Sequence, residues 1–86
     1  MDKKLDPWAL AASLGFTWMI GIVFLGVAAG LGWGEDLIPL ISSIYLGFDT
    51  SAVGIVLGAI WAFVDGVIAG ALLALFYNFF SGKLEK

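Results

Sequence analysis

Two long apolar runs dominate the chain, over residues 8–31 and residues 51–80. The first run contains no charged residue, and the second contains only Asp65. As helices with a rise of 1.5 Å per residue they would be about 36 Å and 45 Å long, whereas the hydrocarbon core of a bilayer is about 30 Å thick. The pattern therefore predicts an all-α fold, an integral membrane helical hairpin with two transmembrane helices. It forms a single membrane domain over residues 1–86, with residues 81–86 as a tail.

The segment between the runs, residues 32–50, has a helical pattern of its own. Its apolar residues recur at spacings of three and four, namely Leu37, Leu40, Ile41, Ile44, Tyr45 and Phe48. Asp36 is placed to cap such a helix, Pro39 fits its first turn, and Gly47 is placed to end it. We therefore expect a short helix in the membrane interface, with one of residues 49–51 capping the second span.

Small residues occupy every fourth position of the second run and form a ladder. The ladder consists of Gly54, Gly58, Ala62, Gly66, Gly70 and Ala74. Lipid tails are as apolar as leucine, so helices in a bilayer associate through close backbone approach and interhelical hydrogen bonds. Each step of four residues turns about 40° further around the helix, so one straight partner cannot follow the whole ladder. We expect two neighbours on it, the first helix and a second chain. The alternative is that the glycines reflect only the glycine tolerance of membrane helices.

Asp65 lies at the midpoint of the second run, where an ionised carboxylate costs at least about 2.5–3.5 kcal/mol. No lysine or arginine lies within either run, so the group is expected to be protonated, and to act as a structural anchor. The expected partners are Thr17 and carbonyls beside ladder glycines. For Thr17 the alternative is a local bond to the carbonyl one turn back. For Asp65 the alternatives are a proton or ion carrier, and a contact to a partner subunit or pigment.

Charge and aromatic placement give the topology. All lysines lie outside the runs, and the connection carries only acids; the residues are Lys3, Lys4, Lys83 and Lys86, against Glu35, Asp36 and Asp49. By the positive-inside rule both termini are expected in the cytoplasm, with the protein in the inner membrane. An interface belt is expected from Trp8, Trp33, Tyr45, Tyr77 and Asn78. A cleaved secretory signal is the alternative for the first run, but a signal core is only about 7–15 residues long.

The composition excludes several classes of function. The chain is 62% hydrophobic with a mean hydropathy of +1.05, which leaves too little polar surface for a soluble domain. It has no cysteine, no histidine and no arginine, so thiolate and imidazole metal sites and His-based nucleophile arrangements are absent. The net charge is −3 with no basic patch, which argues against nucleic acid. We expect no enzymatic activity, no metal and no cofactor.

Part of the chain resembles a known group of proteins. Residues 61–72, residues 76–78 and residues 43–48 look like short two-helix membrane proteins of bacteria and archaea, often labelled bacteriophage holin-like or membrane-associated. The resemblance covers residues 33–78, and its most specific part is an aromatic-x-Asp-Gly-x-x-x-Gly element with a terminal Tyr-Asn. It implies a two-helix fold and points to family-matching positions without assigning chemistry to them: Asp65, Gly66, Gly70, Tyr77 and Asn78.

These features favour a small, non-enzymatic protein that assembles in the lipid bilayer through the ladder. In one version it is a holin-like homo-oligomer. In a second it is an accessory subunit docked on the helices of a larger energy-converting or pigment complex. A third version is a proton- or ion-carrying hairpin that uses Asp65, similar to the rotor subunit of ATP synthase. In that family, however, the loop is basic and cytoplasmic, whereas here it is acidic and expected on the other side.

Overall fold

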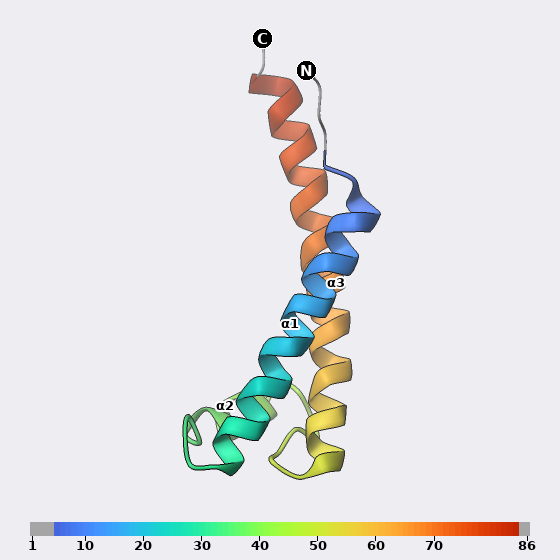
Figure 1. Cartoon of the computed structure of the whole chain (residues 1–86). Helices are drawn as coiled ribbons and strands as arrows, with labels where there is room; N and C mark the ends of the chain where they lie inside the picture. The colour runs from blue at the N-terminus through green and yellow to red at the C-terminus, as the bar shows by residue number, and fades with distance from the viewer. Residues whose placement is uncertain (1–4, 85–86) are drawn as a thin grey trace.

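The computed structural model describes residues 5–84, and within this range the chain is all helical. The helices are α1 (Pro7–Gly30), α2 (Leu37–Ser42) and α3 (Ala52–Leu84). α1 and α3 run antiparallel as a hairpin, with the start of α1 and the end of α3 at the same end (Figure 1). Both are long enough and apolar enough to cross a membrane. The predicted all-α hairpin of two long apolar helices is therefore confirmed.

Local chemistry sets both ends of α1. The Asp6 carboxylate accepts hydrogen bonds from the backbone N–H groups of Trp8 (3.0 Å) and Ala9 (3.4 Å), and proline occupies the first turn, where no N–H is needed. After Gly30 the chain turns through Gly32 and Gly34, whose φ angles of +100° and +76° suit glycine. α1 thus matches the predicted residues 8–31 to within one residue at each end.

α3 begins at a serine cap. The Ser51 hydroxyl accepts a hydrogen bond from the backbone N–H of Gly54 (3.0 Å) and donates one to Asp49 Oδ1 (2.5 Å). The helix then continues without a break to Leu84. Residues 81–84, which were expected to belong to a polar tail, form its last turn instead, because nothing in that stretch interrupts the backbone ladder.

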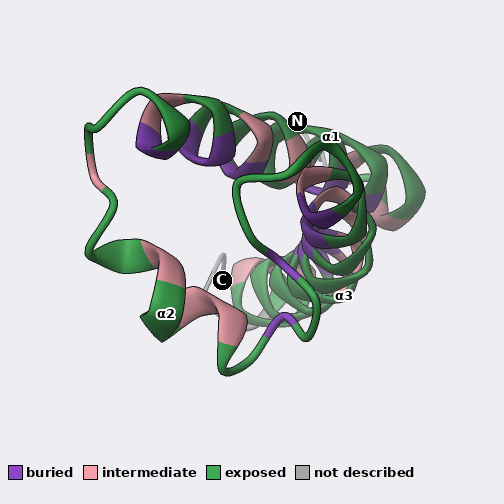
Figure 2. Ribbon diagram, turned by 90° about the horizontal axis from the view of Figure 1, so that it is seen from below, coloured by how far each residue is buried: buried purple, intermediate pink, exposed green. Residues whose placement is uncertain are grey.

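The backbones of α1 and α3 approach closely along the second half of the ladder. A Cβ added at Gly66 would lie 2.5 Å from the Leu14 carbonyl oxygen, and one at Gly70 would lie 2.7 Å from the Leu10 carbonyl oxygen. Ala62 is completely buried. Figure 2 shows the buried positions along the facing sides of the two long helices. Glycine and alanine are needed here because any larger side chain would force the backbones apart.

The connection does not stay at the end of the hairpin but folds back along α3. Phe48 is 2% exposed and packs on Gly58, which lies about 9 Å along the axis from the first residue of α3. Gly47, with φ +91°, makes the turn that brings Phe48 inward. Phe48 joins a core cluster completed by Ile22, Leu25, Tyr45 and Ala62, with Ile38 and Ile41 against it.

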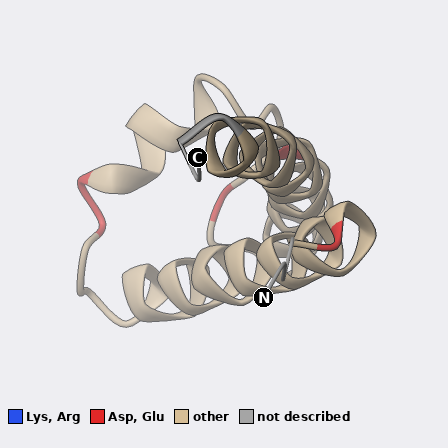
Figure 3. Ribbon diagram, turned by 90° about the horizontal axis from the view of Figure 1, so that it is seen from above, with Lys and Arg blue, Asp and Glu red and all other residues tan. Residues whose placement is uncertain are grey.

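The predicted interfacial helix is shorter than its pattern indicated. α2 has only six residues and ends at Ser42, so it stops well before Gly47. Asp36 precedes it but makes no side-chain capping bond. The reason is tertiary, because Tyr45 and Phe48 leave the helical path to enter the core beside α3. Figure 3 shows the acidic positions mainly in the connection and at the start of α1, with the long helices otherwise nearly free of charge.

Candidate functional site

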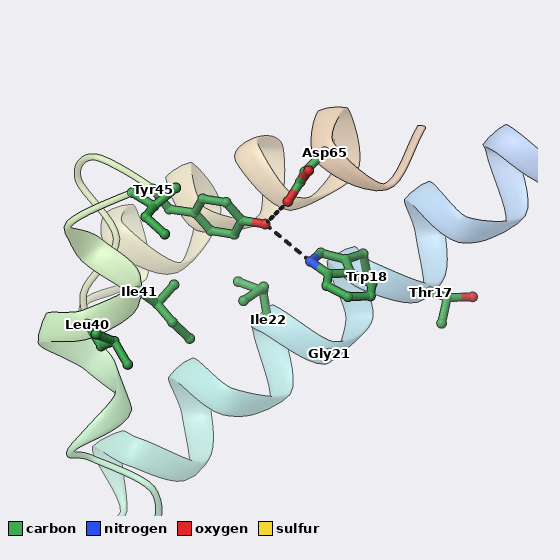
Figure 4. A pocket seen from close by; sticks show the side chains of 9 residues that line it. Thr17, Trp18, Gly21, Ile22, Leu40, Ile41, Tyr45 and Asp65 are labelled. Atoms are coloured by element: carbon green, nitrogen blue, oxygen red, sulfur yellow. Dashed lines mark hydrogen bonds between the residues drawn. The ribbon is translucent and has the colours of Figure 1, made fainter. Parts of the chain in front are cut away.

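Asp65, the acid within the second apolar run, has a partner that lies in the connection. The Tyr45 hydroxyl donates a hydrogen bond to Asp65 Oδ2 (2.5 Å), and Trp18 Nε1 donates one to the Tyr45 hydroxyl oxygen (3.1 Å). Figure 4 shows the three side chains converging from α1, the connection and α3. We call this chain of two bonds the Asp65 relay. It ties the three parts of the hairpin together at one level.

The tyrosine is held in position by its neighbours on α3. Its ring stacks on Trp61 with a centroid distance of 6.3 Å and an interplanar angle of 5°. The Trp61 indole in turn donates to the Leu46 carbonyl oxygen (3.0 Å). This bond satisfies a backbone carbonyl of the non-helical connection, which no helical N–H pairs with. Trp61 therefore fixes both the ring of Tyr45 and the backbone that follows it.

Burial also fixes the protonation state of this tyrosine. Tyr45 is 7% exposed, and burial raises the pKa of its hydroxyl above the ordinary value of 10.0. The hydrogen bond to Asp65 raises this pKa further, and the bond from Trp18 opposes the rise. The phenol therefore keeps its proton at physiological pH. The indole N–H of Trp18 can only donate, so the Tyr45 hydroxyl accepts from Trp18 and directs its own proton to Asp65.

The acid of the connection that precedes α3 is in a different environment. Asp49 is exposed, and hydrogen bonds from the hydroxyl and the backbone N–H of Ser51 lower the pKa of its carboxyl below the usual value. Asp49 is thus an ionised surface residue that holds the Ser51 cap in place. It has no role in the Asp65 relay.

The structure does not bring Thr17 to Asp65. Thr17 is exposed on α1, and its hydroxyl points away from the acid (Figure 4). The expectation failed because Trp18, one residue further, faces the interface and reaches the acid through Tyr45. Ser13 satisfies itself locally by donating to the Ala9 carbonyl oxygen (2.8 Å).

The whole ladder is buried within the chain. α1 covers Gly66 and Gly70, whereas Phe48 and Asp49 of the connection contact Gly58 and Gly54. The rotation of the ladder is therefore followed by two neighbours, as expected, but both belong to the same chain. The sequence pattern led us to expect a second chain on this surface, and the structure leaves no ladder residue exposed for it.

The expected belt residues do not form a single belt. Trp8, Trp33 and Tyr77 are exposed on the outside near the ends of the hairpin. Tyr45 belongs to the core instead. Asn78 pairs with the backbone of Leu5, accepting from its N–H (2.9 Å) and donating to its carbonyl oxygen (2.8 Å). Asn78 therefore fastens the segment before α1 to α3.

A half-open pocket of about 510 Å³ lies beside the relay, between α1, the connection and α3. We call it the Asp65 pocket. Its lining residues are Thr17, Trp18, Gly21, Ile22, Leu40, Ile41, Ile44, Tyr45 and Asp65. The pocket is apolar except for the relay and one hydroxyl. Apolar walls with a few convergent polar groups at this size are typical of small-molecule sites.

A second concavity, the outer groove, lies on the other side of α1. It measures about 600 Å³ and is lined only by apolar residues of the two long helices: Phe16, Met19, Val23, Ile55, Val56, Ala59, Ile60, Phe63 and Val64. It offers shape and apolar contact but no polar group. The outer groove is therefore suited to another helix or to lipid rather than to chemistry.

Sequence reasoning identified Asp65 but not its partners. Trp18 was not among the expected site residues, and Tyr45 was assigned to the interface belt. The signal that favours them is chemical, because an acid among apolar residues needs a donor, and tyrosine and tryptophan carry donors on apolar rings. Among residues 5–84, no group of three or more possible metal-binding side chains comes together. Comparison with protein-family models, curated proteins and solved structures finds no match for this chain.

Proposed function

We propose that this chain is a small, non-enzymatic integral membrane protein whose hairpin crosses the bilayer twice and associates with other membrane helices. The observation that carries the proposal is the outer surface of α1 and α3. Large apolar side chains are more than one-third exposed all along it, for example Phe16, Ile20, Phe24, Val56, Ile60, Val64, Ile68 and Leu72. Continuous apolar surface on this scale is unstable in water, whereas lipid tails solvate it.

Membrane insertion and topology can be tested together, because the chain has no native cysteine. Single cysteines at Glu35 and Lys83 report on the connection and on the end of α3. In intact cells a membrane-impermeant maleimide should label the Glu35→Cys protein and leave the Lys83→Cys protein unlabelled until the cells are opened. The positive-inside rule gives this orientation. Extraction of the protein from membranes by alkaline carbonate would refute insertion.

Association should use the outer groove, because the ladder is already occupied inside the hairpin. Filling the groove with Ala59→Phe is expected to abolish cross-linked oligomers, or co-purification with larger subunits. Val53→Phe is the matched control, since Val53 is 71% exposed and does not line the groove. If both variants assemble normally, the groove is not the contact surface.

The same experiment separates the two versions of the proposal. A series of cross-linked dimers, trimers and larger oligomers, together with collapse of the membrane potential on induction, supports the holin-like homo-oligomer. A monomer in mild detergent that brings down a fixed set of larger chains supports the accessory subunit. The ion-carrying alternative receives less support, because the carboxyl of Asp65 is bonded to Tyr45 of the same chain. Normal growth and assembly of Asp65→Asn would eliminate it.

A further inference from the structure

The Asp65 pocket joins an apolar chamber to a carboxyl group that has bonding capacity left. Asp65 Oδ2 accepts from Tyr45, whereas Oδ1 accepts no hydrogen bond from the residues that the structure describes. The other two donors of the relay are already used, since the Trp18 indole N–H donates to Tyr45 and the Tyr45 hydroxyl donates to Asp65. The free oxygen, Asp65 Oδ1, is an acceptor when the acid is ionised, so it suits a ligand that donates a hydrogen bond and also brings the cation that stabilises the ionised acid.

The charge of the chain points to the same chemistry. No lysine, arginine or histidine occurs from residue 5 to residue 82, so the chain supplies no cation to Asp65. A carboxylate among apolar residues is costly unless it is paired with a cation and hydrogen-bonded. A protonated amine meets both needs in one group, because it is a cation with several N–H donors.

The depth of the site limits where that amine comes from. Asp65 lies about 21 Å along the helix axis from Ser51 and about 22 Å from Phe80, so it is near the middle of the span. Phospholipid amines lie at the headgroup level, about 15 Å from the centre of a hydrocarbon core that is about 30 Å thick. A free lipid-soluble amine that enters from the bilayer can reach the carboxyl, and a phospholipid headgroup cannot do so without leaving its level.

We propose that the Asp65 pocket binds a lipid-soluble amine. Its protonated amino group donates to Asp65 Oδ1, and its apolar body lies against Ile22, Ile41 and Ile44. The route from the bilayer rests on the membrane insertion proposed above, whereas the pocket itself belongs to the folded hairpin and is also present in detergent.

The test uses decylamine with a terminal photoreactive diazirine, and the matched decanol, added to the full-length protein in a mild non-ionic micelle. Cross-linked peptides are mapped by mass spectrometry. The amine should label residues 17–22 and 40–45 in a saturable way, and unlabelled decylamine should compete. The matched alcohol should need about tenfold more probe, since one charge-assisted hydrogen bond corresponds to roughly that factor. Labelling spread evenly over both long helices would overturn the proposal.

Two pairs of variants test separately whether labelling requires the space of the pocket and whether it requires the carboxyl group of Asp65. A Cβ added at Gly21 or at Gly82 meets nothing within 4 Å, but only Gly21 lines the pocket. Gly21→Leu should abolish labelling and Gly82→Leu should preserve it. Asp65→Asn should reduce amine labelling to the level of the alcohol, and Glu35→Gln, which removes an acid outside the pocket, should not. Unchanged amine labelling in Gly21→Leu refutes the site even if Asp65→Asn fails to fold.

A third arm distinguishes the sources of the amine. Phosphatidylethanolamine added to the micelles should not compete with the probe, and efficient competition would replace the free amine with a lipid headgroup. The outcome is also separable from the proposed function. Saturable labelling of a protein that carbonate extracts would refute membrane insertion alone, and absence of labelling in a carbonate-resistant protein would refute the amine site alone.

Discussion

The close approach at Gly66 gives the sharpest test of how the hairpin is held together. Gly66→Ala places a Cβ 2.5 Å from the Leu14 carbonyl oxygen and 2.8 Å from Gly15 Cα, and both obstacles are backbone atoms that cannot rotate away. Ordinary contact begins at 3.4 Å, so α1 and α3 must separate by about 0.9 Å at this level. Overpacking of this kind costs roughly 1–3 kcal/mol.

The measured change in stability also contains an opposing effect, the higher helix propensity of alanine, which must be subtracted to obtain the cost of overpacking. Alanine favours helix over glycine by up to about 1 kcal/mol, and this gain applies to any helical glycine. Gly21→Ala measures it alone, because Gly21 lies inside α1 and its added Cβ meets nothing within 4 Å. We expect Gly66→Ala to be less stable than Gly21→Ala by about 1–3 kcal/mol.

The assay is reversible unfolding of the hairpin by dodecyl sulfate in mixed micelles. Dyes on cysteines introduced at Ser13 and Gly82 report separation of the two long helices by energy transfer, and the chain has no native cysteine to interfere. The midpoint of the transition should fall for Gly66→Ala and stay level or rise for Gly21→Ala. Equal midpoints for the two variants would mean that backbone contact at the ladder does not hold the hairpin.

The remaining predictions concern the relay, the connection and the chain end. Tyr45→Phe should destabilise the hairpin by about 1–3 kcal/mol in the same assay, because two part-buried hydrogen bonds are lost and each contributes about 0.5–1.5 kcal/mol. Thr17→Val should change the stability by less than about 0.5 kcal/mol. The Tyr45 hydroxyl has a pKa above 10.0 in the folded chain, so above about pH 10 the folded state keeps a proton that the unfolded chain releases. The stability of the hairpin should therefore fall as the pH rises above about 10, and Tyr45→Phe should remove this fall. Gly58→Leu should expel Phe48 from the core, which a protease cutting in the connection would detect as faster cleavage, and unchanged cleavage would count against the re-entrant connection. Asn78→Leu should accelerate hydrogen exchange at the start of α1 by about tenfold without changing its centre, since two backbone bonds are lost there.

Much of the architecture followed from local features of the sequence. The two long helices, their lengths and the spacing of the ladder are encoded in runs of consecutive residues, because hydrophobicity and a period of four need no knowledge of the rest of the chain. The same holds for the importance of Asp65, since any carboxyl in the middle of an apolar run must find a partner. For Asp65 the identity of that partner was predicted wrongly, with Thr17 in place of Tyr45.

The tertiary structure decided which surfaces the ladder and the acid meet. Tyr45 and Asp65 are 20 residues apart, and they meet because the turn at Gly47 sends the connection back along α3 rather than across the end of the hairpin. The same return covers the first part of the ladder, so a surface that its spacing suggested for another chain is used within this one. A contact between residues so far apart in the sequence depends on how α1, the connection and α3 fit together, and the local spacing of residues does not encode that fit.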